Sequence, residues 1–173
     1  MKKLLLCLFI PGMISTSLFA QSIKTDRLVY EWSNMKNMVV NSAKAMPEEY
    51  YSQVPAEGLR SFEDQIKHIT TSNRFFVGYL AGVDNEKANA NTMQNVKGKA
   101  AVIKDLEQSF DFVIKTLPTI KGYDEQIDMF GQKLTRTEAL MLTEHHLQRE
   151  QGKITIYMRL KAVAPAKSTS WLL

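Results

Sequence analysis

The chain has 173 residues, of which 45% are hydrophobic and 23% are charged, and its formal net charge is +4. This composition is typical of one ordinary globular domain and excludes a disordered or fibrous protein. The chain is also long enough to bury a substantial core. The basic residues are only slightly in excess and are scattered along the sequence, which argues against nucleic-acid binding.

Residues 1–20 have the pattern of a secretory signal peptide: a basic start, a hydrophobic run that ends at about Ile14, and the small residue Ala20 at the expected cleavage site. The alternative is an uncleaved membrane anchor, but the run is shorter than the ~20 apolar residues that span a bilayer. We therefore predict an exported protein, periplasmic or extracellular, with no stable membrane anchor after cleavage. The mature domain would then cover residues 21–173.

Cys7 is the only cysteine and lies inside this predicted signal peptide. Its neighbours, Leu6 and Leu8, do not form a lipid-attachment pattern. The mature chain would therefore have no thiol, which excludes disulfides, a cysteine nucleophile and thiolate metal ligands. Loss of Lys2 and Lys3 would also lower the formal net charge from +4 to +2.

Two helices are expected in the first half of the mature chain. Apolar residues at steps of three and four predict the first from about Lys24 to Ala45, and Pro47 ends it because proline cannot continue the backbone ladder. Ser61 is suited to cap the second helix and Gly82 to end it. On this second helix, His68 lies about 100° from the main apolar stripe, on a flank of the kind that can border a pocket. The flank comprises Gln65, His68, Ser72, Phe75 and Tyr79.

A polar, Asn-rich stretch from Asp84 to Gln94 is predicted to be a long loop. A third helix is expected between Gly98 and Pro118, and the connection after it is expected to contain a short extended piece at about Met129–Leu134. A fourth helix is expected after this connection. Four helices separated by loops predict an all-α protein, a four-helix bundle.

The fourth helix carries the polar residues of greatest interest. Thr135 followed by Glu138 is a capping-box signature that begins it, and it is expected to end near Val163. His146 and Glu150 lie one turn apart, where both could point at the same ion or substrate atom. They belong to a stripe of residues at steps of three and four: Leu142, His146, Arg149 or Glu150, Lys153, Tyr157 and Leu160.

Two segments resemble the DinB-like superfamily, four-helix bundles that commonly carry a three-histidine metal site. The segment YEWSNMKNMVVNSAKAMPEEYYSQVPAEGLRSFEDQIKHI is similar to the family's helix-one tryptophan, its MPEE and RSF loop, and a histidine early in helix two. The segment HLQREQGKITIYMRLKAVAP is similar to the family's C-terminal region. The resemblance implies metal ligands at His68 and His146, with a third histidine four residues later. This chain has Glu150 at that position, and His145, which projects about 100° from His146, is assigned to the surface.

Two imidazoles and one carboxylate are an acceptable ligand set for a divalent transition metal with open coordination positions. We therefore expect His68, His146 and Glu150 to bind Zn, Ni, Mn or Fe(II). The resemblance implies a metal-dependent hydrolase or transferase that acts on a small molecule, and a homodimer. No catalytic residue beyond these ligands follows from the sequence. The alternative is a non-catalytic binding or interaction module, in which Arg149 and Lys153 neutralise Glu150 without a metal.

Overall fold

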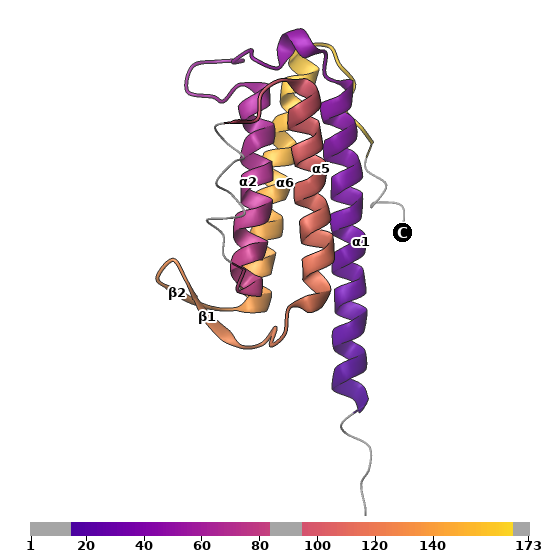
Figure 1. Ribbon diagram of the computed structural model, residues 1–173, viewed down its shortest axis with the longest axis vertical. Helices are drawn as coiled ribbons and strands as arrows, with labels where there is room; N and C mark the ends of the chain where they lie inside the picture. Colours follow the sequence, from indigo (N-terminus) through magenta and orange to yellow (C-terminus); the bar gives the residue numbers. More distant parts are fainter. Residues whose placement is uncertain (1–14, 84–94, 168–173) are drawn as a thin grey trace, which may run out of the picture.

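The described part of the chain folds into a bundle of four long helices. In the computed structural model, the backbone is described for residues 15–83 and 95–167, and side chains are described from Thr25 onward. The helices are α1 (Ser15–Ala45), α2 (Phe62–Ala81), α5 (Lys99–Thr116) and α6 (Arg136–Leu160), with two short 3₁₀ segments at Glu48–Tyr50 and Leu117–Thr119. Figure 1 shows the four helices side by side, with the N-terminal end of α1 extending beyond the others. The predicted all-α four-helix bundle is confirmed.

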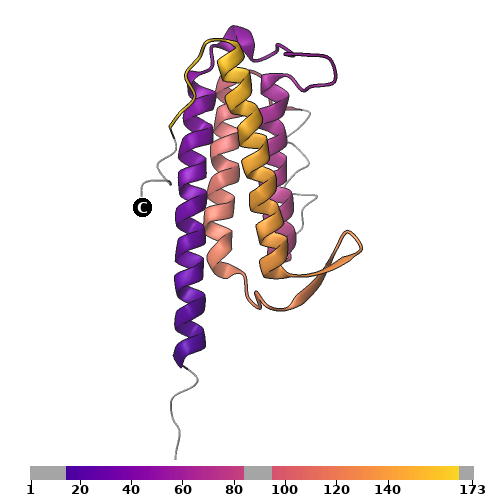
Figure 2. The ribbon, with the colours of Figure 1, turned by 180° about the vertical axis from the view of Figure 1, so that it is seen from behind.

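The helices do not simply alternate in direction. The colours in Figures 1 and 2 show that α1 and α6 run one way, whereas α2 and α5 run the other way. Lys99, at the start of α5, donates a hydrogen bond of 2.8 Å to the carbonyl of Met46, just after the end of α1. Helices α2 and α5 are therefore parallel although they are consecutive among the described helices. The predicted Asn-rich loop, residues 84–94, lies outside the described residues.

The helix ends follow the predicted capping signals. The Ser61 side chain accepts a hydrogen bond from the backbone N–H of Asp64, and Gly82 ends α2 in the left-handed conformation with φ of 68°. Thr135 and Glu138 form the predicted capping box at the start of α6. Each cap satisfies backbone groups that the adjacent helical turn leaves unpaired.

The core is formed by the apolar faces of all four helices. Its larger members come from each helix in turn: Trp32 and Val39 from α1, Phe62, Ile66 and Ile69 from α2, Leu106, Phe110 and Val113 from α5, and Ile154 and Met158 from α6. Helix α2 packs extensively against both α5 and α6. The predicted site residues lie on α2 and α6, which pack against each other.

The buried face of α6 differs from the polar stripe predicted for it. Leu142 and Leu160, at the two ends of that stripe, are exposed. Most of the residues that face the core lie further around the helix, although Glu150 and Tyr157 belong both to the predicted stripe and to the buried face. The buried residues are Ala139, Leu140, Thr143, Leu147, Glu150, Ile154, Tyr157 and Met158. Glu150 is thus the one carboxylate on the core-facing side of α6, whereas His146 lies at its edge.

A β-hairpin precedes α6 and replaces the single extended piece expected near residues 129–134. Strands β1 (Gln126–Met129) and β2 (Gln132–Thr135) pair antiparallel, with Met129 opposite Gln132. Phe130 and Gly131 form the two-residue turn, and both have positive φ, 56° and 79°. This is the backbone pattern of a type I′ turn, which suits the twist of a hairpin. Since Thr135 both ends β2 and caps α6, the hairpin is attached directly to the helix that carries His146.

Two predicted boundaries change. Helix α1 begins at Ser15 rather than near Lys24, and α6 ends at Leu160 rather than near Val163. The first fourteen residues of the predicted signal peptide lie outside the described residues, so the signal peptide stays a prediction. Among the described residues, no helix is both long enough and apolar enough to cross a membrane.

Candidate metal centre and adjoining cavity

His68, His146 and Glu150 come together between α2 and α6. One potential ligand atom from each residue lies within 4.8 Å of the other two. The two imidazole rings meet edge to face, with centroids 5.1 Å apart. His68 comes from the mixed flank of α2, and the other two residues lie one turn apart on α6. The structure therefore brings the three predicted ligands into one group that could hold a metal ion.

Glu150 is the most buried member of this group, with only 1% of its surface exposed. Lys153 donates to both carboxylate oxygens, at 2.9 Å to Oε1 and 2.8 Å to Oε2. Gln65 reaches across from α2 and donates to Oε2 at 2.7 Å. Arg149 Nε lies 3.4 Å from Oε1, and His68 Nε2 lies 3.9 Å from Oε2. The buried charge is thus held in one orientation by partners from both helices.

His146 is oriented by a hydrogen bond at each ring nitrogen. Arg149 Nη2 lies 3.0 Å from Nδ1, and Ser72 Oγ lies 3.1 Å from Nε2. A guanidinium group can only donate, so Nδ1 accepts this bond and the ring proton is on Nε2. The ring also packs edge to face against Phe76, with centroids 5.4 Å apart. Its position is therefore fixed by α2 as well as by its own helix.

The electrostatics of the group favour neutral imidazoles beside an ionised carboxylate. Burial, together with the nearby charge of Arg60, lowers the pKa of His68 to about 4. Burial likewise lowers the pKa of His146. For Glu150, burial alone raises the pKa, but the hydrogen bonds from Lys153 and Gln65 outweigh it and bring the pKa down to about 2. Neutral imidazole and ionised carboxylate are the forms that coordinate metals, and both are present at pH 7.

The donor set fits a divalent ion if three adjustments occur. One ring nitrogen of His146 must become free for the metal, because Nδ1 accepts from Arg149 and Nε2 carries the ring proton beside Ser72. Zinc ligands at about 2.0–2.2 Å in tetrahedral geometry lie ~3.4 Å from one another, so the three side chains must close by about 1 Å. The ammonium group of Lys153 must also leave the carboxylate. Its side chain is 37% exposed, and its flexible stem can carry the charge into solvent. The residues present are therefore compatible with a metal, which must compete with Lys153 for Glu150.

A cavity of about 360 Å³ opens beside this group. It is bounded by α2, the hairpin and α6, and is lined by Phe76, Met129, Phe130, Gln132, Leu134, Leu142, Thr143, His145, His146 and Arg149. His146 and Arg149 thus belong both to the candidate metal centre and to the cavity wall. His145, predicted to lie at the surface, is exposed there. Of the three predicted ligands, His146 lines this cavity.

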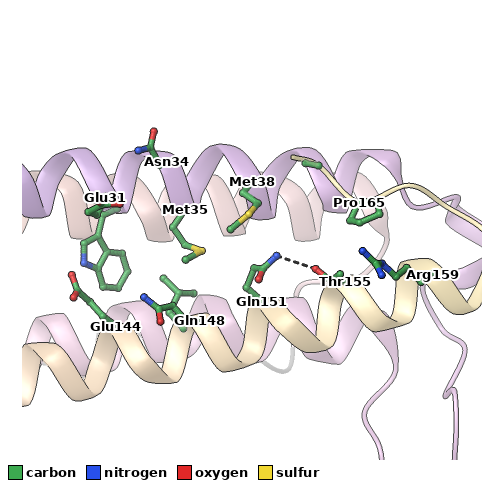
Figure 3. A pocket seen from close by; sticks show the side chains of 13 residues that line it. Glu31, Asn34, Met35, Met38, Glu144, Gln148, Gln151, Thr155, Arg159 and Pro165 are labelled. Atoms are coloured by element: carbon green, nitrogen blue, oxygen red, sulfur yellow. Dashed lines mark hydrogen bonds between the residues drawn. The ribbon is translucent and has the colours of Figure 1, made fainter. Parts of the chain in front are cut away.

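A second, larger cavity of about 490 Å³ lies between α1 and α6. Figure 3 shows Met35, Met38 and Gln151 facing the space between these two helices, with Glu144 toward one end and Arg159 toward the other. None of the three predicted ligands lines this cavity. Despite its size, it is therefore not part of the candidate metal centre.

Sequence reasoning missed part of the site. Gln65 and Ser72 lie on the same flank as His68, one turn before it and one turn after it, but no role is predicted for either residue from the sequence. Their i−3 and i+4 spacing was the signal that could have assigned them. Phe130 was not singled out, because nothing local shows that the hairpin folds back over α2. The alternative partners proposed for Glu150, Arg149 and Lys153, are both in place.

Comparison with known proteins assigns this arrangement to a family. The model of the DinB family matches residues 20–170, so the chain belongs to the DinB family. The uncharacterized protein YjoA of Bacillus subtilis is 26% identical over 144 residues, which cover 79% of this chain and 90% of that protein. The crystal structure of a DinB-like protein, YjoA from Bacillus subtilis, matches with a TM-score of 0.64 at 25% identity, covering 79% of this chain and 92% of that one. The resemblance inferred from the two sequence segments is confirmed.

The lowered pKa of His68 predicts how stability depends on pH in metal-free protein. The folded state binds a proton at His68 only near pH 4, whereas the unfolded chain does so near pH 6.5. Stability is therefore complete above about pH 6.5 and falls as the pH drops toward 4, by on the order of 2 kcal/mol for this residue. His68→Gln should remove much of this loss, as measured by urea unfolding in EDTA at pH 7 and pH 4.5.

The exposed His145 provides the matched control, and His145→Gln should keep the wild-type pH dependence. An equal loss of stability in the wild type and in His68→Gln would contradict the burial of a neutral imidazole at position 68.

Proposed function

We propose that this DinB-family protein binds one divalent metal ion through His68, His146 and Glu150, and that Zn, Ni, Mn or Fe(II) is its cofactor. The observation that carries the proposal is the buried, ionised Glu150 carboxylate beside two neutral imidazoles. Because a carboxylate is a harder ligand than the third imidazole that the family commonly uses, the site should be less selective for soft metals.

The activity proposed for this site is metal-dependent hydrolysis of a small molecule. A bound divalent ion would supply Lewis acidity and lower the pKa of a coordinated water toward ~7. The chain's own residues would fix the ligands. Gln65 orients the Glu150 carboxylate, and either Ser72 or Arg149 would orient the His146 ring through the nitrogen that does not bind the metal. We rank hydrolysis above thiol transfer, because an exported protein would be separated from the cytoplasmic thiol pool.

A second candidate function is a non-catalytic binding module, and one observation favours it. Lys153 already contacts both oxygens of Glu150, so the carboxylate is neutralised without a metal. In that case the Glu150–Lys153 pair would be a permanent structural ion pair. Breaking a buried pair by removing one partner costs about 3–5 kcal/mol, since the remaining charge is left uncompensated.

Lys153→Met distinguishes the two functions. If Lys153 and a metal compete for the Glu150 carboxylate, this variant should bind zinc at least as tightly as the wild type. Zinc should also restore the stability of the variant by mass action. His146→Ala should weaken zinc binding by about tenfold or more, since it removes a ligand. Zinc affinity would be measured by chelator competition, with thermal unfolding followed in the same samples, on protein purified without a histidine tag.

His145→Ala is the control and should bind zinc as the wild type does. The metal-binding proposal would be refuted if neither the wild type nor Lys153→Met binds stoichiometric metal and if zinc does not restore the stability that Lys153→Met has lost. This result would support the binding module.

Export and dimerisation are the remaining parts of the proposal. Export is supported by the pattern of residues 1–20, and a homodimer is supported only by the family resemblance. The mass of the mature chain isolated from the periplasm or the culture medium should correspond to a start at Gln21. A protein retained in the cytoplasm with Met1 intact would contradict export.

A further inference from the structure

The cavity beside His146 has an apolar wall built from three elements. The hairpin supplies Met129, Phe130 and Leu134, while α2 and α6 supply Phe76 and Leu142. Its volume of about 360 Å³ lies within the ~300–1,000 Å³ range of small-molecule pockets. The wall can therefore accommodate an apolar body of modest size.

Phe130 is the least expected residue of this wall. It has a φ of 56°, a conformation that Asn, Asp and Gly adopt far more readily than a bulky residue. It is also 64% exposed, so its position is not explained by burial in the core. Yet its ring stacks on Phe75, with centroids 5.8 Å apart and planes 10° apart, and on Tyr79, with centroids 6.1 Å apart. A strained, exposed aromatic ring aligned with others is typical of a ligand contact.

The hairpin that carries Phe130 is held on both sides. The Tyr79 hydroxyl on α2 donates to the backbone carbonyl of Asp128 in β1. At the start of α6, the backbone N–H of Arg136 donates to the carbonyl of Glu125 at 3.1 Å. The Asp128 side chain accepts from the N–H of Gly131 at 2.8 Å and thereby fixes the turn. The hairpin therefore holds the Phe130 ring against the flank of α2.

The polar side of the cavity carries positive charge and no carboxylate among its lining residues. His145, His146 and Arg149 lie there. Arg149 uses Nη2 to reach His146 and Nε to approach Glu150, and its Nη1 group makes no hydrogen bond within the described part of the chain. A guanidinium group with free donors is suited to a carboxylate. An anionic group is thus the complementary partner for this end.

We infer that the cavity binds a small carboxylate with an aromatic or branched apolar body, stacked on Phe130 and paired with Arg149. This substrate class rests on the proposed function, since it treats the cavity as the substrate side of the metal site. The apolar body would lie between the hairpin and Phe76, and the carboxylate would lie at Arg149, close to His146.

The test uses 3-phenylpropionate as the probe and its neutral analogue 3-phenylpropionamide as the matched comparison. Binding would be measured by calorimetry or ligand-observed NMR on the full chain, both in EDTA and with zinc. The wild type should prefer the carboxylate over the amide by about tenfold, because a hydrogen bond to a charged group is the stronger one. Arg149→Gln should abolish this preference. Gln148→Ala, on the wall of the larger cavity between α1 and α6, should bind as the wild type does.

Phe130→Asn separates a binding role from a structural one. Asn-Gly is a favoured type I′ turn, so this variant should keep or raise thermal stability while losing affinity for 3-phenylpropionate by about fivefold or more. A destabilised Phe130→Asn, or one with unchanged affinity, would overturn the inference, as would a wild type that shows no saturable binding or no preference for the carboxylate.

Measuring zinc affinity in the same variants keeps the two proposals apart. Probe binding in EDTA without any zinc binding would refute the metal proposal and leave the carboxylate pocket standing. Zinc binding without probe binding would refute the pocket alone.

Discussion

The buried carboxylate of Glu150 is the interaction on which the arrangement of α2 and α6 depends. A charge that is only 1% exposed is costly unless it is paired and hydrogen-bonded. Lys153 neutralises it from the next turn of α6, and Gln65 crosses from α2 to complete its hydrogen bonds. Because Gln65 and His68 lie one turn apart on α2, satisfying Glu150 also brings His68 opposite His146. The geometry of the candidate metal centre thus follows from one buried charge.

Helix α6 separates two cavities of different character. On one side, the 360 Å³ cavity combines aromatic walls with Arg149 and the histidines; on the other, the 490 Å³ cavity lies against α1 and contains Glu31 and Glu144 at its acidic end. Burial raises the pKa of the Glu144 carboxyl above its usual value. Only the first of these two cavities is lined by a predicted ligand, His146. The proposed function therefore involves the cavity on the face of α6 that carries His146, although the other cavity is larger.

Much of the fold could be predicted because it depends on local signals. Ser61, Gly82 and Thr135 each act on the turn next to them, and the apolar residues of α1, α2 and α5 that form the core recur at helical spacing. Spacing and resemblance together predict His68, His146 and Glu150 as metal ligands, and the structure brings the three residues into one group. The burial of Glu150 was harder to predict, since it depends on a hydrogen bond from Gln65, which lies on another helix and far away in the sequence. Phe130 could not be predicted at all, because its stacking on Phe75 joins residues far apart in the chain.

A crystal structure of the zinc-soaked protein would test most directly whether Glu150 is a carboxylate for which Lys153 and a metal compete. The account predicts zinc within about 2.0–2.2 Å of one nitrogen each of His68 and His146 and of one Glu150 oxygen, with the Lys153 ammonium turned away. Density that shows Lys153 still bonded to both carboxylate oxygens, with no metal between the two histidines at saturating zinc, would contradict it.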